Sequence, residues 1–426
     1  MPTPRRAARR ACARCRREVA EQAKGPRANY RLKGTATPGL STLGYVSVNA
    51  VDVFSGEQVE RARRYHRPLY FALALDLLSG VGVLAVLAFS RVGDALFRLV
   101  DGGPWWLDAL AFVAVVIGVS TLARLPLSFW RSYLHEKEWD LSTQTASGWL
   151  VDAGKAFAVA LVFSWIWIVG LIALARSFPS WWPLVAALGA GAFVLVAGFV
   201  APVLLEPLFN RFEPLADAEL ADELRSLAQS AGTPVRDVLV ADASRRTKKS
   251  NAYVSGFGAT RRVVLYDTLL QRSDPREVKL VIAHELGHRR ERHIAKGTSL
   301  GMLGAVGAVL AMWALLRSSD VRAAVGVTGA GDPRVAPFLM LAGVALELLA
   351  LPFATALSRR WERAADRFSL EVTRDPEAFE TAHRELAASN LSDLQPPRAL
   401  YVLTSSHPTP VERIAAARRW GTTQAA

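Results

Sequence analysis

The sequence AFAVALVFSWIWIVGLIAL, at residues 156–174, carries no charged side chain. An α-helix needs about 20 residues of this kind to cross the hydrocarbon core of a bilayer. Five further blocks are apolar and mostly uncharged, at residues 71–89, 109–122, 184–205, 300–316 and 337–357. Buried helices of a large soluble core, the alternative interpretation, usually supply runs of only about ten to fourteen apolar residues. We therefore predict a mainly α, polytopic membrane protein with about six transmembrane helices.

The basic residues gather before the first block, between the fourth and fifth blocks, and after the sixth. Six crossings return these segments to one side of the membrane, and the positive-inside rule makes that side cytoplasmic. The formal net charge of +13 then reflects topology and attraction to anionic lipid, since no aromatic interleaving or reader fold points to nucleic acid. We expect a multi-pass protein of a bacterial plasma membrane with no nucleic-acid partner.

The blocks also divide the chain into parts of different character. Its two cysteines, Cys12 and Cys15, lie in an Arg-rich leader without periodicity, where we expect flexible chain and free thiols. After the fourth block, a helical pattern that stops at Gly232 and three β-rich runs predict a small folded domain. The predicted parts are a leader (1–54), spans one to four (55–205), a cytoplasmic α+β domain (206–297), spans five and six (298–357) and a C-terminal part (358–426).

A metal-binding motif lies on a helix of the cytoplasmic domain. The sequence DPRE at residues 274–277 predicts the start of this helix, with an aspartate N-cap, a proline at the first position and a glutamate at the third. His284 and His288 follow four residues apart, so both imidazoles project from one face and can share one zinc ion. Glu285 lies about 100° around the helix and can reach a metal-bound water.

A zinc site in a hydrolase takes three protein ligands and a water, so a third ligand must come from elsewhere. His293 lies about 140° around the helix from His288, and we expect it to point away and to be structural. Glu362 and Asp366 are four residues apart just past the sixth block, where two further crossings return the chain to the cytoplasmic side. They offer one acid to bind the metal and one to hold a histidine's other ring nitrogen.

The order of these motifs resembles the integral-membrane zinc endopeptidases of the CAAX prenyl protease 1 type, with the heat-shock protease HtpX as a more distant relative. The resemblance extends from Ser55 to Trp420 and includes IAHELGH at residues 282–288. The other blocks that carry it are LPLSFWRSYLHEKEWDLSTQT (125–145), PVLLEPLFNRFEPL (202–215), SNAYVSGFGATRRVVLYDTLL (250–270), SRRWERAAD (358–366) and SSHPTPVERI (405–414).

The resemblance implies a zincin-like catalytic domain and a set of site residues. It implies one Zn²⁺ per chain on His284, His288 and Glu362, with Glu285 as the catalytic base. Asp366 would hold the other ring nitrogen of a ligand histidine. It further implies that Asn251 and His407 contact the scissile region and that the spans enclose a large chamber. The segment of Asn251, Ala252, Tyr253, Val254, Ser255 and Gly256 becomes the expected substrate edge, because free backbone groups can bind a peptide as an added strand.

The expected activity is cleavage of membrane-associated or unfolded proteins, with the lipid bilayer and a peptide or protein substrate as partners and no obligate protein partner. Eukaryotic members of the family have an additional amino-terminal hydrophobic helix and a histidine where this sequence has Lys249. Two substrate classes stay open, CAAX-like C-terminal processing and membrane-protein quality control. The rival interpretations are a transporter, suggested by Asp76 and Glu347 within the spans, and an inactive metal-binding scaffold, which has no need of Glu285.

Overall fold

The computed structural model describes residues 49–256 and 261–425. Within these residues helices predominate, and six of them are long and apolar enough to cross a membrane, as the apolar blocks predicted. These candidate spans are Gly56–Phe89, Trp105–Glu138, Ala146–Ser177, Trp182–Phe209, His293–Arg317 and Pro333–Thr373. Cys12 and Cys15 lie outside the described residues, as does most of the predicted leader. The last residues assigned to that leader include Ala50, Val53 and Phe54, which are buried against the C-terminal part of the chain.

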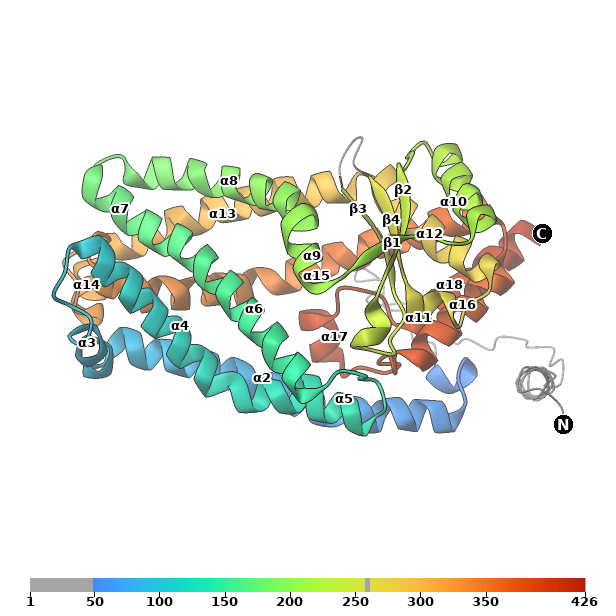
Figure 1. The fold of residues 1–426 in the computed structure, drawn as a ribbon, viewed down its shortest axis with the longest axis horizontal. Helices are drawn as coiled ribbons and strands as arrows, with labels where there is room; N and C mark the ends of the chain where they lie inside the picture. The colour runs from blue at the N-terminus through green and yellow to red at the C-terminus, as the bar shows by residue number, and fades with distance from the viewer. Residues whose placement is uncertain (1–48, 257–260, 426) are drawn as a thin grey trace, which may run out of the picture. The chain divides into compact units, whose positions relative to one another are not determined.

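Three of the spans contain a π-helical turn, an irregularity that lets a helix change direction while its backbone stays hydrogen-bonded. The spans are built from α2 (Gly56–Phe89), α4–η3–α5 (Trp105–Phe129, Trp130–Leu134, His135–Glu138), α6–η4–α7 (Ala146–Ser164, Trp165–Val169, Gly170–Ser177), α8–η5–α9 (Trp182–Val200, Ala201–Leu205, Glu206–Phe209), α13 (His293–Arg317) and η8–α15 (Pro333–Val335, Ala336–Thr373). Short helices α3 (Arg91–Phe97) and α14 (Ser319–Val325) connect them at one end (Figure 1).

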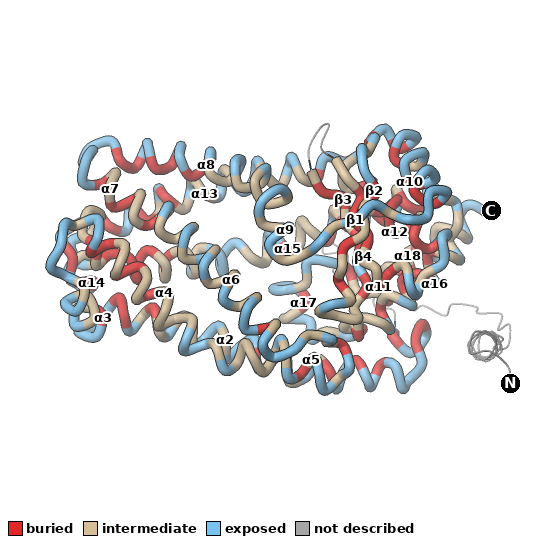
Figure 2. Tube along the Cα trace, viewed as in Figure 1, coloured by how far each residue is buried: buried red, intermediate tan, exposed pale blue. Residues whose placement is uncertain are grey.

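The spans pack unevenly along their length. Helix α13 runs along α8, and α2 contacts both α4 and α15 (Figure 1). Their shared core, with Phe112, Ile172 and Met312, lies at the end near α3, α7 and α14. Figure 2 shows that the middle stretches of the same helices are mostly intermediate or exposed. The spans therefore pack tightly at the end remote from the sheet and loosely beside it.

The small domain contains a four-stranded sheet in the order β1-β2-β4-β3, with β3 at an edge. Strand β4 pairs parallel with β2 and antiparallel with β3, and β1 is antiparallel to β2. The strands are β1 (Phe212–Pro214), β2 (Asp237–Ala241), β3 (Ala252–Ser255) and β4 (Arg262–Tyr266). Helices α10 (Ala218–Ser230) and α12 (Pro275–Arg290) share a hydrophobic core with the sheet, built around Leu224, Leu265 and Ile282. This arrangement confirms the predicted α+β domain.

Helix α15 joins the membrane part to this domain because it continues past its apolar block at residues 337–357. Its last turns pack against α12, where a Cβ on Gly287 would come within 3.0 Å of the Ala365 Cα. Ser369 Oγ also donates to the Leu280 carbonyl at 2.9 Å. The remaining helices are α11 (Asp267–Leu270), α16 (Pro376–Ser389), α17 (Arg398–Thr404) and α18 (Pro410–Ala425). The close approach of α12 and α15 brings HExxH to Glu362.

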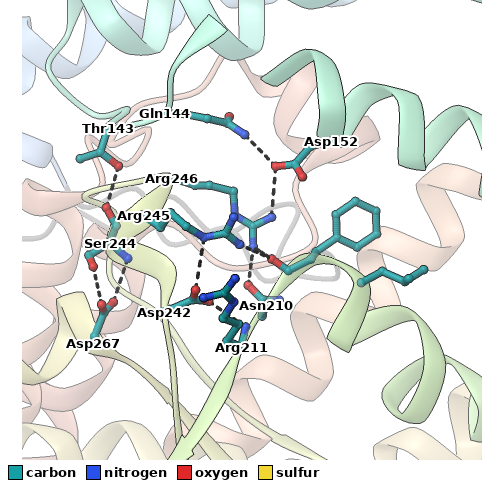
Figure 3. Close-up of polar contacts among 12 residues, drawn as sticks. Thr143, Gln144, Asp152, Asn210, Arg211, Asp242, Ser244, Arg245, Arg246 and Asp267 are labelled. Carbon is teal, nitrogen blue, oxygen red and sulfur yellow. Dashed lines mark hydrogen bonds and ion pairs between the residues drawn. The ribbon is translucent and has the colours of Figure 1, made fainter. Parts of the chain in front are cut away.

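A polar cluster around Arg246 fastens the third span to the sheet (Figure 3). The Arg246 guanidinium donates to Asn210 Oδ1 at 2.5 Å and lies 3.5 Å from Asp152 at the start of α6. Thr143, in the loop before α6, donates to the Ser244 carbonyl at 2.7 Å. Such pairing compensates these partly buried charges for the water that they lose. The cluster holds the edge of the sheet beside the membrane part.

Candidate metal centre

The helix that carries HExxH begins as the sequence predicts. Asp274 Oδ1 accepts the Glu277 N–H at 3.0 Å, and Glu277 Oε2 accepts the Asp274 N–H at 3.0 Å. This capping box satisfies two backbone donors that a helix N-terminus otherwise leaves free. The apolar side of α12 is buried against the sheet. The helix is therefore fixed in rotation, and His284 and His288 face away from that core toward α15.

Two imidazoles and one carboxylate converge at this point. His284 Nε2 lies 3.2 Å from Glu362 Oε2, and His288 Nε2 lies 3.2 Å from Glu362 Oε1. The two Nε2 atoms are 3.2 Å apart. Glu362 Oε2 is buried and accepts no hydrogen bond from any residue that the structure describes. An orphaned carboxylate oxygen beside two imidazole nitrogens fits a divalent metal ion, and this donor set is one that zinc hydrolases use.

Asp366 and Arg413 support His284 from behind. Asp366 Oδ1 accepts from His284 Nδ1 at 2.8 Å, which leaves Nε2 free to face the metal position. Arg413, on α18, donates its Nε to Asp366 Oδ2 at 2.9 Å. Both acids on α15 thus lie where the four-residue spacing placed them. No motif spacing in the sequence points to Arg413, although this residue lies within the SSHPTPVERI block.

His293 does not point away from the histidine pair, and this expectation is wrong. Helix α12 ends at Arg290, Arg292 adopts a left-handed φ of 55°, and His293 starts α13. The break turns the His293 ring back, so that its Nδ1 lies 3.1 Å from His288 Nδ1. The ring also stacks on Trp361, with centroids 5.1 Å apart. His293 therefore holds the outer nitrogen of His288, much as Asp366 holds that of His284.

Glu285 and His407 line a cavity of about 480 Å³ beside the three converging residues. Burial raises the pKa of Glu285, and a carboxylate in such an environment is a better proton acceptor than an exposed one. His407 Nε2 lies 3.4 Å from Glu362 Oε1, and its Nδ1 contacts Ser406 Oγ at 2.8 Å. The His407 side chain is 60% exposed, so it can reach a molecule in the cavity.

The expected substrate edge lies along the same cavity. The Tyr266 N–H donates to the Asn251 carbonyl at 3.0 Å, so the alternation of an antiparallel pair turns the backbone groups of Ala252 and Val254 outward. Asn251 and Ala252 line the cavity. Tyr253 and Ser255 instead direct their hydroxyls to Glu206, at 3.3 and 3.0 Å.

The N–H and carbonyl groups of Ala252 and Val254 are the four outward backbone groups on this edge. Two of them already have hydrogen-bond partners within the protein. The Ala252 N–H donates to Asn251 Oδ1 at 2.9 Å, and the Val254 carbonyl accepts from Arg289 Nη2 at 2.7 Å. The strand ends at Ser255, and the next residue, Gly256, has a φ of 81° that favours glycine. Upstream, Asn390 clamps the backbone of Ser250 with two hydrogen bonds, at 2.8 and 3.0 Å. Neither Asn390 nor Arg289 was expected at the site, because only the fold brings them to β3.

Comparisons with known proteins match this arrangement. The family described as "Peptidase family M48" matches residues 214–421, and "CAAX prenyl protease N-terminal, five membrane helices" matches residues 45–211. An uncharacterized metalloprotease, YhfN, of Bacillus subtilis is 32% identical over 77% of this chain and 78% of its own length. CAAX prenyl protease 1 of Saccharomyces cerevisiae is 31% identical over 51% of this chain and 48% of its own length.

A solved structure supports the fold. The crystal structure of S. mikatae Ste24p aligns with a TM-score of 0.78, at 23% identity, over 87% of this chain and 91% of that one. The alignment therefore includes both the spans and the small domain, so the two parts occur together in another protein.

Proposed function

Because this chain belongs to peptidase family M48 and is an integral-membrane metallopeptidase, we propose that it uses one zinc ion to cleave extended segments of membrane-associated or unfolded proteins. The observation that carries the proposal is the convergence of His284, His288 and Glu362, each within 3.2 Å of another, beside the free edge of β3. A transporter would not need two imidazoles and a carboxylate that converge beside an open strand edge.

His284, His288 and Glu362 would hold the ion, and Asp366 and Arg413 would keep His284 in the tautomer whose Nε2 is free. When bound, zinc supplies Lewis acidity and lowers the pKa of a coordinated water toward ~7. Glu285 takes a proton from the attacking water and can return it to the leaving amine. Because burial raises the pKa of Glu285, its carboxylate can accept the proton of the water and its carboxylic acid can later donate that proton to the amine.

His407 is the donor that we assign to the oxyanion of the tetrahedral intermediate. It reaches the cavity from the loop before α18, and its 3.4 Å distance to Glu362 Oε1 places it beside the metal ligands. A donor of this kind typically contributes about 10²–10³ to kcat. Asn251, at the entrance of β3, would orient the substrate backbone near the scissile bond.

The substrate would bind as an added strand on β3. The Ala252 carbonyl and the Val254 N–H are the outward groups without a hydrogen bond to a described residue. An extended peptide can pair with both, and this form of binding depends on backbone more than on side chains. The proposal therefore favours a sequence-tolerant endopeptidase over one restricted to a single C-terminal motif.

Metal analysis of purified variants beside a fluorogenic peptide assay tests the assignment. Alanine at His284, His288 or Glu362 should remove most of the zinc and the activity. Glu285→Gln should keep about one zinc per chain and lose activity by at least about 10³-fold. Zinc binding without any cleavage by wild type would leave only a metal-binding scaffold. Activity of Glu285→Gln equal to that of an active wild type would instead rule out Glu285 as the base. A Glu362→Ala variant that retains its zinc would overturn the ligand set.

The proposed orientation places the small domain in the bacterial cytoplasm, as the basic residues around it favour. Single cysteines in a background without Cys12 and Cys15 test this. A cysteine at exposed Arg272 should react with an impermeant thiol reagent only after the cells are opened. Proteomics that compares Glu285→Gln, as a substrate trap, with wild type would then separate C-terminal processing from quality control.

A further inference from the structure

A second cavity of about 530 Å³ lies on the other side of the HExxH helix end. Four arginines line it, and no carboxylate occurs among its described lining residues. The lining consists of Gly232, Thr233, Arg261, His288, Arg289, Arg290, Arg292, Ile294 and Ala295. We call it the arginine pocket. Guanidinium groups around one cavity repel one another, so the pocket has a strong preference for an anionic occupant.

The chain is folded so that these side chains can reach the pocket. Arg292 takes its left-handed φ of 55° at the break between α12 and α13. The Arg290 guanidinium lies against Gly232, where a Cβ would come within 2.9 Å of its Nη1. Gly232 itself has a φ of 70°, a second reason for glycine at this position. The helix break and the glycine together make room for cations beside the end of α12.

The pocket also touches the proposed catalytic machinery. His288, one of the three converging residues, forms part of its wall. Arg289, another wall residue, donates to the outward Val254 carbonyl of β3 at 2.7 Å. The first cavity meets β3 at Asn251 and Ala252. A peptide along β3 would therefore pass from the catalytic cavity to the arginine pocket over two strand residues, roughly 7 Å.

We propose that the arginine pocket is a substrate subsite that binds the carboxylate of an aspartate or glutamate, two to four residues from the scissile bond. This inference rests on the proposed peptidase function and specifies its substrate class, since it selects acidic segments. Arginine suits this role because its planar fork binds a carboxylate through two parallel hydrogen bonds. A carboxylate that draws Arg289 away from Val254 would also free that carbonyl for the substrate strand.

An anionic lipid headgroup has the same charge, and the pocket lies at the start of the fifth span. The substrate assignment is favoured for two reasons. His288, a wall residue of the pocket, is also one of the three residues of the candidate metal centre, and Arg289, another wall residue, bonds to the substrate edge. A lipid headgroup at this position would lie inside the path of the peptide. A substrate carboxylate and a lipid headgroup would also give different experimental results.

The experiment uses purified full-length enzyme and a cleaved host peptide with glutamate or glutamine at each of four positions on either side of the scissile bond. We expect glutamate at one position to raise kcat/KM by at least about 10-fold over glutamine. The double variant Arg290→Gln/Arg292→Gln should lower this ratio at least about threefold, because it removes two of the four guanidinium groups and leaves Arg261 and Arg289. Arg290→Glu/Arg292→Glu should abolish the preference for glutamate, because the two new carboxylates offset the charges of Arg261 and Arg289. Arg272→Gln, an exposed arginine outside the pocket, is the matched control and should keep the ratio.

Binding of the same peptides to Glu285→Gln, measured by fluorescence anisotropy, gives a second readout that needs no catalysis. If wild type cleaves no peptide, the proposed function fails, but a tenfold tighter binding of the glutamate peptide would still support the subsite. Equal glutamate-to-glutamine ratios in wild type and in Arg290→Gln/Arg292→Gln would overturn it. The variants could instead change cleavage only in anionic lipid nanodiscs, and equally for the glutamate and glutamine peptides. That result would also overturn the subsite, because the occupant would then be lipid.

Discussion

His293 shows how one side chain changes role when the backbone turns. On a continuous helix its ring would lie about 140° from His288 and could not touch it. The left-handed Arg292 breaks the helix, and the ring packs between His288 and Trp361 instead. Nothing in the spacing alone predicts this, since arginine rarely adopts a positive φ. The orientation of His288 in the candidate metal centre therefore depends on a residue outside the three converging side chains.

We predict that His293→Ala weakens zinc binding by about 10- to 100-fold, the usual effect of removing a group that holds a metal-ligating histidine. The free His288 ring would lose its fixed orientation. Zinc retained after dialysis against graded chelator concentrations measures this. His135→Ala is the control, because His135 is also buried but bonds to the Tyr65 carbonyl, at 3.0 Å, away from the site. Zinc affinity equal to that of wild type would show that Trp361 stacking is the only role of His293.

Glu277 offers a test at a residue outside the site. It is 5% exposed, and burial, together with Glu385, raises its pKa from 4.5 to about 7. A carboxyl with a raised pKa favours the folded state while protonated, and this stabilisation is lost as the pH rises through about 7. Glu277→Gln keeps an acceptor for the Asp274 N–H but carries no charge. Its melting temperature should match wild type at pH 5 and exceed it by roughly 2–4 °C at pH 8.

The control for this measurement is Glu377→Gln, which changes an exposed glutamate in the first turn of α16. It should behave like wild type at both pH values. A Glu277→Gln variant that is equally stabilised at pH 5 and pH 8 would show that charge is not the cause.

At the scale of elements, the sequence predicts what depends on local rules. The capping box of α12 and the strand runs of β2, β3 and β4 follow from residue types at fixed offsets, and the structure contains all of them. Strand β1, only three residues long, had no such signal. The partners that meet across elements were also missed, as Asn390 on Ser250 and Arg413 on Asp366 show. Long-range contacts have no local spacing from which they could be predicted.

Gly287 lies where α12 closely approaches α15. Any Cβ there would come within 3.0 Å of the Ala365 Cα on α15, a backbone atom that cannot move alone. Gly287→Val should therefore separate α12 from α15, lower the melting temperature by several degrees and reduce zinc content, because Glu362 lies on α15. Gly304→Ala is the control, since nothing lies within 4 Å of its added Cβ. A stable, zinc-loaded Gly287→Val would mean that the helices can separate without disturbing the ligands.

For the molecule as a whole, hydropathy predicts the number of spans but not how they pack. All six apolar blocks lie in candidate spans. The contrast between a tight distal end and loosely packed middle stretches (Figure 2) depends on which faces meet, which hydropathy does not record. Asp76, which suggested a transport pathway, forms a two-pronged ion pair with Arg124 on the neighbouring helix, at 2.8 and 2.6 Å. A pair of this kind neutralises the charge within the spans.

Glu347 lies mid-span on α15 without such a pairing among the described ion pairs, and its side chain is exposed. An ionisable group in lipid is costly, so we predict that Glu347 faces a hydrated chamber between the spans. A cysteine at position 347, without Cys12 and Cys15, should then react with a small water-soluble thiol reagent. Leu349 lies about 200° around the helix and should face lipid, so Leu349→Cys is the unreactive control.

The same chamber predicts how Glu347→Leu affects activity. Zinc content and cleavage of a short peptide should equal those of wild type, because Glu347 is far along α15 from Glu362, fifteen residues or about 22 Å of helix. Cleavage of a full-length membrane-bound substrate should fall, since it would have to pass the altered wall. If Leu349→Cys reacts and Glu347→Cys does not, the helix faces are reversed and the chamber must lie elsewhere. If Glu347→Leu instead unfolds in detergent, Glu347 is a buried structural partner in the membrane, and the loosely packed stretches close around it.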